Sequence, residues 1–273
     1  MKPKIFFTDL DDTLLNTDKE ISSGNRAALA ELKKQGHYIA ICTGRATGSA
    51  VGLAHRLGLD DDHCFLITYN GSHIFEWRSK KLIYTAGLPL DVVRFIFDEG
   101  KKFGINVQTY REDAVLVEED NYDIREYIKI QSIPYLVVED VTKAVDQLPP
   151  KVLAADYRHP ERVAEFRRQI TPLLEGKADI FLSHIELLEF VPPGVNKGNA
   201  VRYLCDYLSI PLENSVAAGD AENDLSMITA AHVGCAMCNG EDGVKEAADY
   251  VTVSDCDHDG VAELLHRFIL DEQ

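Results

Sequence analysis

The sequence predicts an α/β protein: a doubly wound, Rossmann-like parallel-sheet core with an inserted α+β cap domain. Two observations support this prediction. Short apolar runs alternate with single helices in both end portions of the 273-residue chain, an arrangement typical of βαβ units. Between these portions the alternation is lost, which indicates an insert of different architecture.

Three buried strands are predicted in the N-terminal portion. Each is a short, continuous apolar run, as expected for a strand that is covered on both faces of a parallel sheet. A helix is expected after the first strand, with a serine as its cap and Gly36 as its stop, and another ends near Gly58. The strands are predicted at residues 5–8, 38–42 and 65–68, and the first helix at 24–35.

The pattern changes after Asn70-Gly71. A polar turn at 78–81 separates two short apolar runs, 74–77 and 82–85, which predicts a hairpin. The segment that follows contains two long amphipathic helices, near 90–103 and 160–175, and strand-like runs at 135–138 and 152–155.

Parallel-sheet character returns toward the end of the chain. A helix is predicted at 197–208, strands at 215–218, 233–236 and 250–253, and a closing helix at 260–270. We therefore predict a discontinuous core, residues 1–84 and 186–273, and an inserted cap, residues 85–185.

Composition restricts the possible partners. The chain has 28 basic and 45 acidic residues, a net charge of −17, so neither nucleic acid nor an anionic membrane is an expected partner. No segment approaches the roughly eighteen apolar residues that a membrane span needs. The start turns acidic too soon for a signal peptide, and the cysteines lie mostly in apolar runs, as in a reducing compartment. We expect a cytoplasmic protein; the sequence does not predict its oligomeric state.

Polar clusters follow the predicted strands or open the predicted helices. Ligands bind at the carboxyl ends of strands in doubly wound sheets, so these clusters should converge. Converging carboxylates need a divalent cation, and oxygen ligands without nearby His or Cys favour Mg²⁺. A hydroxyl, an ammonium and backbone amides at helix starts suit a phosphate. The clusters are Asp9-Leu10-Asp11-Asp12-Thr13, Thr43-Gly44-Arg45, residues 193–198 with Lys197, and Gly219-Asp220 through Asp224.

These clusters, in this order, resemble the four motifs of the haloacid dehalogenase superfamily. The first matches its D-x-D-x-T signature, although Asp12 stands where the commonest form has glycine. Asn70-Gly71 and the segments 193–200 and 236–240 further resemble the Cof-type phosphatases, which have a large type IIB α/β cap between motifs two and three. The resemblance spans essentially the whole chain.

The resemblance implies a role for each matching residue. Asp9 would be the nucleophile that forms an aspartyl-phosphate, and Asp11 the general acid and base. Thr43 and Lys197 would stabilise the phosphoryl oxygens. The residues implied to bind phosphate or substrate are Leu10, Thr43, Gly44, Arg45, Asn70, Lys197 and Asn223; those implied to hold Mg²⁺, directly or through water, are Asp9, Asp11 (by its backbone carbonyl), Asp220, Asn223 and Asp224.

The residues themselves support this division of labour. Two carboxylates two residues apart can share one face of a strand end. Metal-bound Asp9 would stay ionised, whereas Asp11, facing Asp9 without side-chain metal coordination, should hold a proton more easily. Arg45 can equally serve to brace the core.

The sequence therefore predicts a Mg²⁺-dependent phosphatase that acts on small phosphorylated metabolites, with sugar phosphates favoured. A phosphomutase would use the same aspartyl-phosphate. A phosphoacceptor or ligand-binding protein would share the acidic cluster, but it would gain nothing from Asp11 as a base that delivers water.

Overall fold

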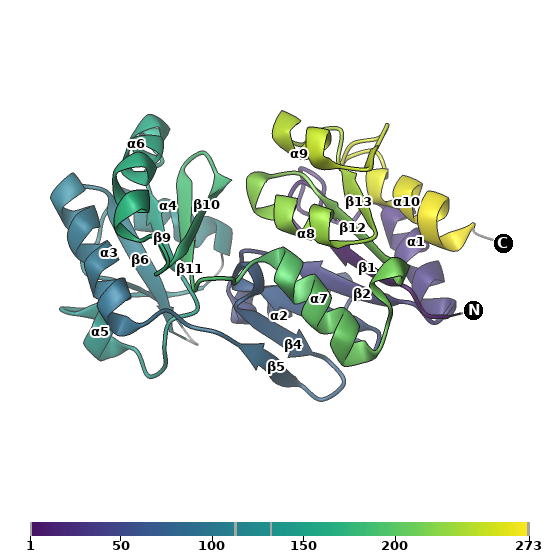
Figure 1. Ribbon diagram of the computed structural model, residues 1–273, viewed down its shortest axis with the longest axis horizontal. Coiled ribbons are helices and arrows are strands. Elements are labelled where there is room, and N and C mark those ends of the chain that lie inside the picture. The colour runs from purple at the N-terminus through teal and green to yellow at the C-terminus, as the bar shows by residue number, and fades with distance from the viewer. Residues whose placement is uncertain (1, 112–113, 132, 272–273) are drawn as a thin grey trace.

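The computed structural model describes residues 2–111, 114–131 and 133–271, which form two sheets side by side, each with helices packed on it (Figure 1). No helix within these ranges is both long and apolar enough to cross a membrane.

The larger sheet has eight strands in the order β14-β13-β12-β1-β2-β3-β4-β5. Neighbours from β14 to β3 pair in parallel, and the β4–β5 hairpin adds two antiparallel strands at one edge. The strands are β1 (Ile5–Thr8), β2 (Tyr38–Cys42), β3 (Cys64–Thr68), β4 (His73–Glu76), β5 (Lys81–Thr85), β12 (Ser215–Gly219), β13 (Val233–Ala236) and β14 (Tyr250–Val251). The predicted strands and hairpin of this sheet are confirmed, with ends shifted by one or two residues.

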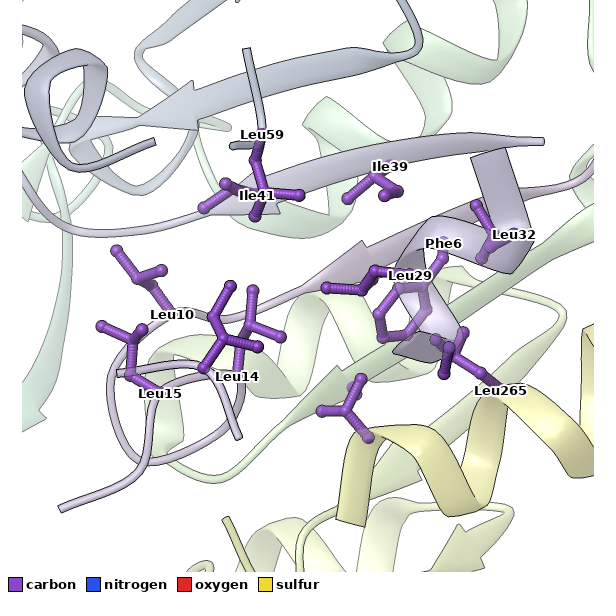
Figure 2. Close-up of a cluster of buried hydrophobic side chains, with 14 of the residues drawn as sticks. Phe6, Leu10, Leu14, Leu15, Leu29, Leu32, Ile39, Ile41, Leu59 and Leu265 are labelled. Carbon is purple, nitrogen blue, oxygen red and sulfur yellow. The ribbon is translucent and has the colours of Figure 1, made fainter. Parts of the chain in front are cut away.

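Helices cover both faces of this sheet, so its central strands β1, β3 and β12 are buried throughout, whereas the edge strands β5 and β14 are partly exposed. Phe6 points into the cluster formed with α1, α2 and α10, which is drawn in Figure 2. Its neighbours Ile5 and Phe7 point to the opposite face, where α7 and α8 pack. The helices are α1 (Ser23–Lys34), α2 (Thr47–Leu57), α7 (Lys197–Leu208), α8 (Leu225–Ala230), α9 (Asp242–Ala247) and α10 (Gly260–Leu265). The predicted doubly wound class is confirmed.

The second sheet has six strands in the order β10-β11-β9-β6-β7-β8. All its pairs are antiparallel except β7 with β8. α3, α5 and α6 cover one face, and α4 packs on the other. The elements are β6 (Asn106–Arg111), β7 (Ala114–Val117), β8 (Tyr135–Val137), β9 (Val152–Ala155), β10 (Asp179–His184), β11 (Leu187–Val191), α3 (Leu90–Phe103), α4 (Tyr122–Gln131), α5 (Val141–Ala144) and α6 (Pro160–Ile170).

The limits of the insert differ from the expected boundary between residues 185 and 186. That boundary falls in the turn between β10 and β11, which pair with each other, and β11 also pairs with β9. The second sheet therefore continues to Val191. The apolar run of β11 precedes the helix that begins at Lys197, and nothing local in the run reveals which sheet it joins.

The two sheets are joined along a contact that brings distant segments together. The carbonyl of Pro150 accepts the hydroxyl of Ser72, a core residue, at 2.7 Å, and within the insert the neighbouring carbonyl of Pro149 accepts the N–H of Leu88 at 2.8 Å. On the far side, Arg167 of α6 forms a bidentate ion pair with Glu222, at 3.0 and 2.6 Å. The insert is thus held to the core at both ends of the contact.

Gly71, in the core, occupies a position that only glycine fits. Its φ is 110°, and a Cβ there would lie 2.6 Å from the carbonyl oxygen of Asn196, the residue that caps α7. Gly36 offers a matched comparison, because its φ is 83° but a Cβ added there would meet nothing within 4 Å beyond its chain neighbours.

We expect Gly36→Ala to lower the free energy of unfolding by about 1–2 kcal/mol, the usual cost of a positive φ for an L-residue. Gly71→Ala should cost about 1–3 kcal/mol more, because overpacking is added to that strain. Equilibrium denaturation in urea measures both values. Equal losses in the two variants would show that the approach of Gly71 to Asn196 does not constrain the fold.

Candidate functional site

The predicted polar clusters meet at the carboxyl ends of the central strands. Asp9 follows β1, and its N–H donates to the carbonyl of Ala218 in β12 at 2.9 Å. The loop after β2 contains Thr43, and the loop after β12 leads into the 3-10 helix Glu222–Asp224. Lys197 is the first residue of α7, because the side chain of Asn196 accepts the N–H of Asn199 and so caps the helix there.

Lys197 joins two of these loops through a buried ammonium group. Its side chain is fully buried, and Nζ donates to Oδ1 of Asp9 at 2.5 Å and to Oδ1 of Asp224 at 2.6 Å. Burial alone would lower the pKa of Lys197, but the charges of Asp224 and Asp9 outweigh it and raise the pKa above its ordinary value. Lys197 is therefore a permanent cation that holds the Asp9 carboxylate in one orientation.

Three carboxylates form a compact acidic group beside Lys197. Oxygen atoms of Asp9, Asp220 and Asp224 lie within 4.8 Å of one another. Burial raises the pKa of Asp9 well above its ordinary value, although Lys197 opposes the shift. Burial, followed by the charge of Asp224, raises the pKa of Asp220 to about 7. One ammonium does not neutralise this group, so its donor set fits a hard divalent cation.

The members of the acidic group differ in how free their oxygens are. Oδ2 of Asp224 accepts the N–H groups of Asp220 and Ala221 at 3.0 and 3.1 Å, while its Oδ1 is taken by Lys197. Asp220 has one oxygen on the hydroxyl of Thr13 at 2.6 Å. Asp224 therefore serves mainly to hold Lys197 and the loop, and Asp9 and Asp220 are better placed as direct ligands.

Asp11 is placed differently from what we expected. The guanidinium of Arg45 donates to both carboxylate oxygens of Asp11 at 2.7 Å, and Nζ of Lys19 lies 3.3 Å from Oδ1 of Asp11. Burial tends to raise the pKa of Asp11, but the hydrogen bonds and charges of Arg45 and Lys19 outweigh it and lower the pKa. The expectation that Asp11 holds a proton easily is therefore wrong for this arrangement, because Arg45 neutralises the carboxylate.

A group of buried polar atoms lies beside the loop of residues 43–45. Asn70, in the left-handed region at φ 57°, is completely buried, and its Oδ1 accepts Nδ2 of Asn223 at 3.1 Å. Its own Nδ2 has no partner among the described residues, although buried donors are normally paired. A Cβ on Gly44 would lie 3.2 Å from this Nδ2. The unpartnered donor beside a bare glycine backbone fits an anionic ligand.

The remaining implied phosphate ligands lie at the same strand ends. Thr43 is buried, and its Oγ1 accepts the N–H of Arg45 at 3.2 Å. The side chain of Leu10 belongs to the hydrophobic cluster of Figure 2, so only its backbone is available to a ligand.

The backbone conformation at Asp12 is one that favours glycine. Its φ is 60°, in the region that glycine adopts freely and that aspartate tolerates better than most residues. Its carbonyl accepts Nδ2 of Asn239 at 2.8 Å, which fixes the turn. The extra charge of Asp12 lies at 3.3 Å from Lys19 rather than in the acidic group.

Sequence reasoning missed the part of the site that the insert supplies. Lys151 donates from Nζ to the carbonyl of Gly44 at 2.8 Å, and Glu189 lies 2.8 Å from the same ammonium. Tyr110 and Tyr127 are also buried, and their hydroxyls are hydrogen-bonded at 2.5 Å. The ammonium of Lys151 lies over the ring of Tyr110. These four residues are far apart in the sequence and do not form a recognisable motif. A charged residue inside an otherwise apolar strand, as Glu189 is in β11, was the one available signal.

Comparisons with known proteins show the family to which the chain belongs. The family model of the haloacid dehalogenase-like hydrolases matches residues 6–265. A Bacillus subtilis phosphatase, 5-amino-6-(5-phospho-D-ribitylamino)uracil phosphatase YcsE, is 32% identical over 98% of this chain and 96% of its own. The crystal structure of a haloacid dehalogenase-like hydrolase from Bacteroides thetaiotaomicron has a TM-score of 0.86 and 32% identity, covering 97% and 99% of the two chains. A subclass IIB sugar phosphatase, at 24% identity and a TM-score of 0.82, covering 98% and 99%, shares the fold.

One match is only partial. It covers 98% of this chain but 47% of a chloroplastic endoribonuclease, YBEY, of Arabidopsis thaliana, at 30% identity. The chain thus spans about half the length of that relative. The other comparisons confirm the predicted resemblance to Cof-type phosphatases and the predicted class of enzyme, a phosphatase. The chain belongs to the haloacid dehalogenase-like hydrolases.

Proposed function

We propose that the protein is a cytoplasmic, Mg²⁺-dependent phosphatase that hydrolyses small phosphomonoesters, sugar phosphates above all, through an aspartyl-phosphate on Asp9. The observation that carries this proposal is the buried Asp9 carboxylate, held at 2.5 Å by Lys197 beside the carboxylates of Asp220 and Asp224. A carboxylate fixed in this way, next to a place for a cation, suits in-line attack on phosphorus.

The reaction divides into two displacements at phosphorus. An oxygen of Asp9 attacks, the bond to the leaving alcohol oxygen breaks, and that oxygen takes a proton from Asp11. Asp11, now ionised, accepts a proton from water, whose oxygen attacks the phosphorus of the aspartyl-phosphate. Inorganic phosphate leaves and the Asp9 carboxylate is restored.

Asp11 needs a proton for the first of these steps, but the hydrogen bonds from Arg45 favour its ionised form. We infer that the dianionic phosphoryl group competes with Asp11 for the guanidinium of Arg45, since Arg binds phosphate as well as carboxylate in bidentate fashion. Once Arg45 turns away, burial is the main remaining influence on Asp11, and burial raises its pKa. Substrate binding would then prepare the general acid.

The remaining residues bind and orient. Lys197, the Thr43 hydroxyl, the backbone amides of Leu10 and Gly44, and Nδ2 of Asn70 would contact phosphoryl oxygens. Mg²⁺, when bound, would neutralise the carboxylates and attract the charge of the phosphoryl group. The residues that would hold it are Asp9, Asp220 and the backbone carbonyl of Asp11, with Asn223 and Asp224 around them.

The preference for sugar phosphates rests on the insert and on one relative. The face of the second sheet toward the core presents the buried polar groups of Gln108 and Tyr110, and Tyr127 of α4 is hydrogen-bonded to Tyr110. The Bacillus subtilis relative is named for a phosphorylated ribityl substrate, which has several hydroxyls. Polar groups of this kind suit a hydroxyl-rich leaving group.

Removal of divalent metal by EDTA should abolish phosphate release from p-nitrophenyl phosphate, and Mg²⁺ should restore it. The circular dichroism spectrum should stay unchanged, because the acidic group lies at the edge of the core rather than within it. Full activity after thorough chelation would disprove the metal requirement.

The metal-free protein should also become less stable as pH rises from about 4 to about 7. The pKa of Asp220 is raised to about 7 in the folded state, so folding favours its protonated form. This stabilisation is complete below the unfolded pKa and is lost as pH approaches the folded pKa. Chemical denaturation across this range should show the decline, and Asp220→Asn should weaken it, whereas the exposed Asp91→Asn should not. Mg²⁺ should reverse the decline, because it binds the ionised carboxylates.

Two isosteric substitutions test the covalent mechanism. Asp9→Asn should form no phosphoenzyme and leave no more than a trace of turnover. Asp11→Asn retains the nucleophile but loses proton transfer, which is worth a factor of about 10²–10⁴. With p-nitrophenyl phosphate, whose leaving group needs little acid, phosphorylated Asp9 should accumulate in Asp11→Asn and appear in the intact mass after acid quench. Substantial turnover by Asp9→Asn would contradict the mechanism, and a long-lived wild-type phosphoenzyme that discharges only to an added sugar would indicate a mutase.

A further inference from the structure

Lys151 enters the site from the insert, but its backbone is anchored at the contact between the two sheets. It directly follows Pro149 and Pro150, whose carbonyls accept hydrogen bonds from Leu88 and Ser72. Its own carbonyl accepts the hydroxyl of Thr109 at 2.9 Å. Because hydrogen bonds hold the backbone before and at Lys151, the position of its Cα is fixed.

The side chain is buried, and two polar groups contact its ammonium. Only 1% of it is exposed, and its ammonium lies 2.8 Å from the carbonyl of Gly44 and 2.8 Å from Oε2 of Glu189. Glu189, 2% exposed, accepts the hydroxyl of Ser183 with its other oxygen at 2.8 Å. The ring of Tyr110 lies 5.0 Å from the ammonium. Glu189 therefore orients Lys151 toward the loop of residues 43–45.

A buried ion pair of this kind is not explained by stability. Hydrophobic replacements of such pairs are often neutral or stabilising, because desolvation offsets the attraction. Burial lowers the pKa of Lys151, and the charge of Glu189 opposes that shift only in part. The pair is maintained against this cost, at a place where its ammonium contacts a phosphate-binding loop.

The contact with Gly44 determines how that loop presents its groups. The Gly44 carbonyl and the Arg45 N–H belong to one planar trans peptide and point in opposite directions. With the carbonyl held by Lys151, the N–H of Arg45 points to Oγ1 of Thr43, to which it donates at 3.2 Å. Oγ1 accepts there, so its own proton is left to donate to a ligand. In the preceding peptide, the Thr43 carbonyl accepts the N–H of Asn70 at 3.0 Å, which turns the Gly44 N–H the other way.

We propose that Lys151, oriented by Glu189, is a positioning residue that fixes the Gly44–Arg45 peptide and thereby aims the Thr43 hydroxyl and the Gly44 amide at the phosphoryl group. This inference rests on the proposed function, because it assumes that the loop binds phosphate. Lys151 acts through the loop and does not select the leaving group. The insert thus contributes to phosphate binding for every substrate.

The test uses the full chain and inorganic phosphate as the probe, with Mg²⁺ present. Lys151→Met removes the ammonium and keeps the apolar stem. Lys151→Met combined with Glu189→Gln also removes the carboxylate that would otherwise stay buried without a partner, so it protects the fold. Arg94→Met is the matched control, because Arg94 also bridges carboxylates of the insert, Asp98 and Glu118, far from the loop.

Titration calorimetry should show phosphate binding about tenfold weaker in the double variant, as expected for loss of a charged group's hydrogen bond to the loop. KM for p-nitrophenyl phosphate and for sugar phosphates should rise by a similar factor, since all share the phosphoryl group. Arg94→Met should lower the melting temperature without changing phosphate affinity.

Wild-type phosphate affinity in the folded double variant would overturn the proposal, because the pair would then be structural only. A loss confined to sugar phosphates, with inorganic phosphate and p-nitrophenyl phosphate unaffected, would also overturn it and assign Lys151 to the leaving group. Failure of the proposed function looks different: the wild type itself would neither bind phosphate nor hydrolyse p-nitrophenyl phosphate, and the inference would fall with it.

Discussion

The buried ammonium of Lys197, bonded to Asp9 and Asp224, is the interaction on which the rest of the site depends. A charge without water must be surrounded by opposite charge, so three loops have to meet at one point. This requirement sets how the start of α7, the loop after β12 and the end of β1 come together, and how the Asp9 carboxylate is turned. The same ammonium is too little positive charge for three carboxylates, and the unbalanced remainder makes the place suitable for a cation.

Much of the core could be predicted from the sequence, because strands buried on both faces are continuous apolar runs and motif residues follow them directly. In the insert, the two predicted helices and the two predicted strands are confirmed as α3, α6, β8 and β9, but the other strands and their pairing were not predicted. β6 contains Asn106, Gln108 and Tyr110 on one face, all of them buried, so its apolar alternation is masked. β11 pairs with β9, and Lys151 contacts Gly44. Both contacts join segments that are far apart in the sequence, so no local sequence pattern predicts them. The grip of Arg45 on Asp11 was missed for the same reason: the two residues were assigned separate roles, and their distance depends on how two loops fold together.

The two sheets contribute different kinds of groups to the site. Strand ends of the core supply carboxylates, amides and one ammonium at fixed positions, because parallel strands bring their carboxyl ends to one edge. The insert supplies the side of a sheet rather than its end, with tyrosines, an amide and the Lys151–Glu189 pair facing inward. The Lys151–Glu189 pair is tied to the loop of residues 43–45, but the other groups on the side of the sheet can change one at a time without moving the strand ends. The surroundings of the leaving group can therefore vary while the chemistry stays the same.

The pairing of β1 with β12 also bears on how the chain reaches its native state. Ile5 lies opposite Ser215, near the other end of the chain, so the central ladder of the core closes a very long loop. Contacts of such high sequence separation form late, and during synthesis β1 waits with one edge unpaired until β12 has left the ribosome. The insert, whose strands are all contained between residues 106 and 191, can fold in the meantime. Asp9 meets Lys197 and Asp220 only when this ladder closes, so a nascent chain has no assembled site before β12 has joined β1.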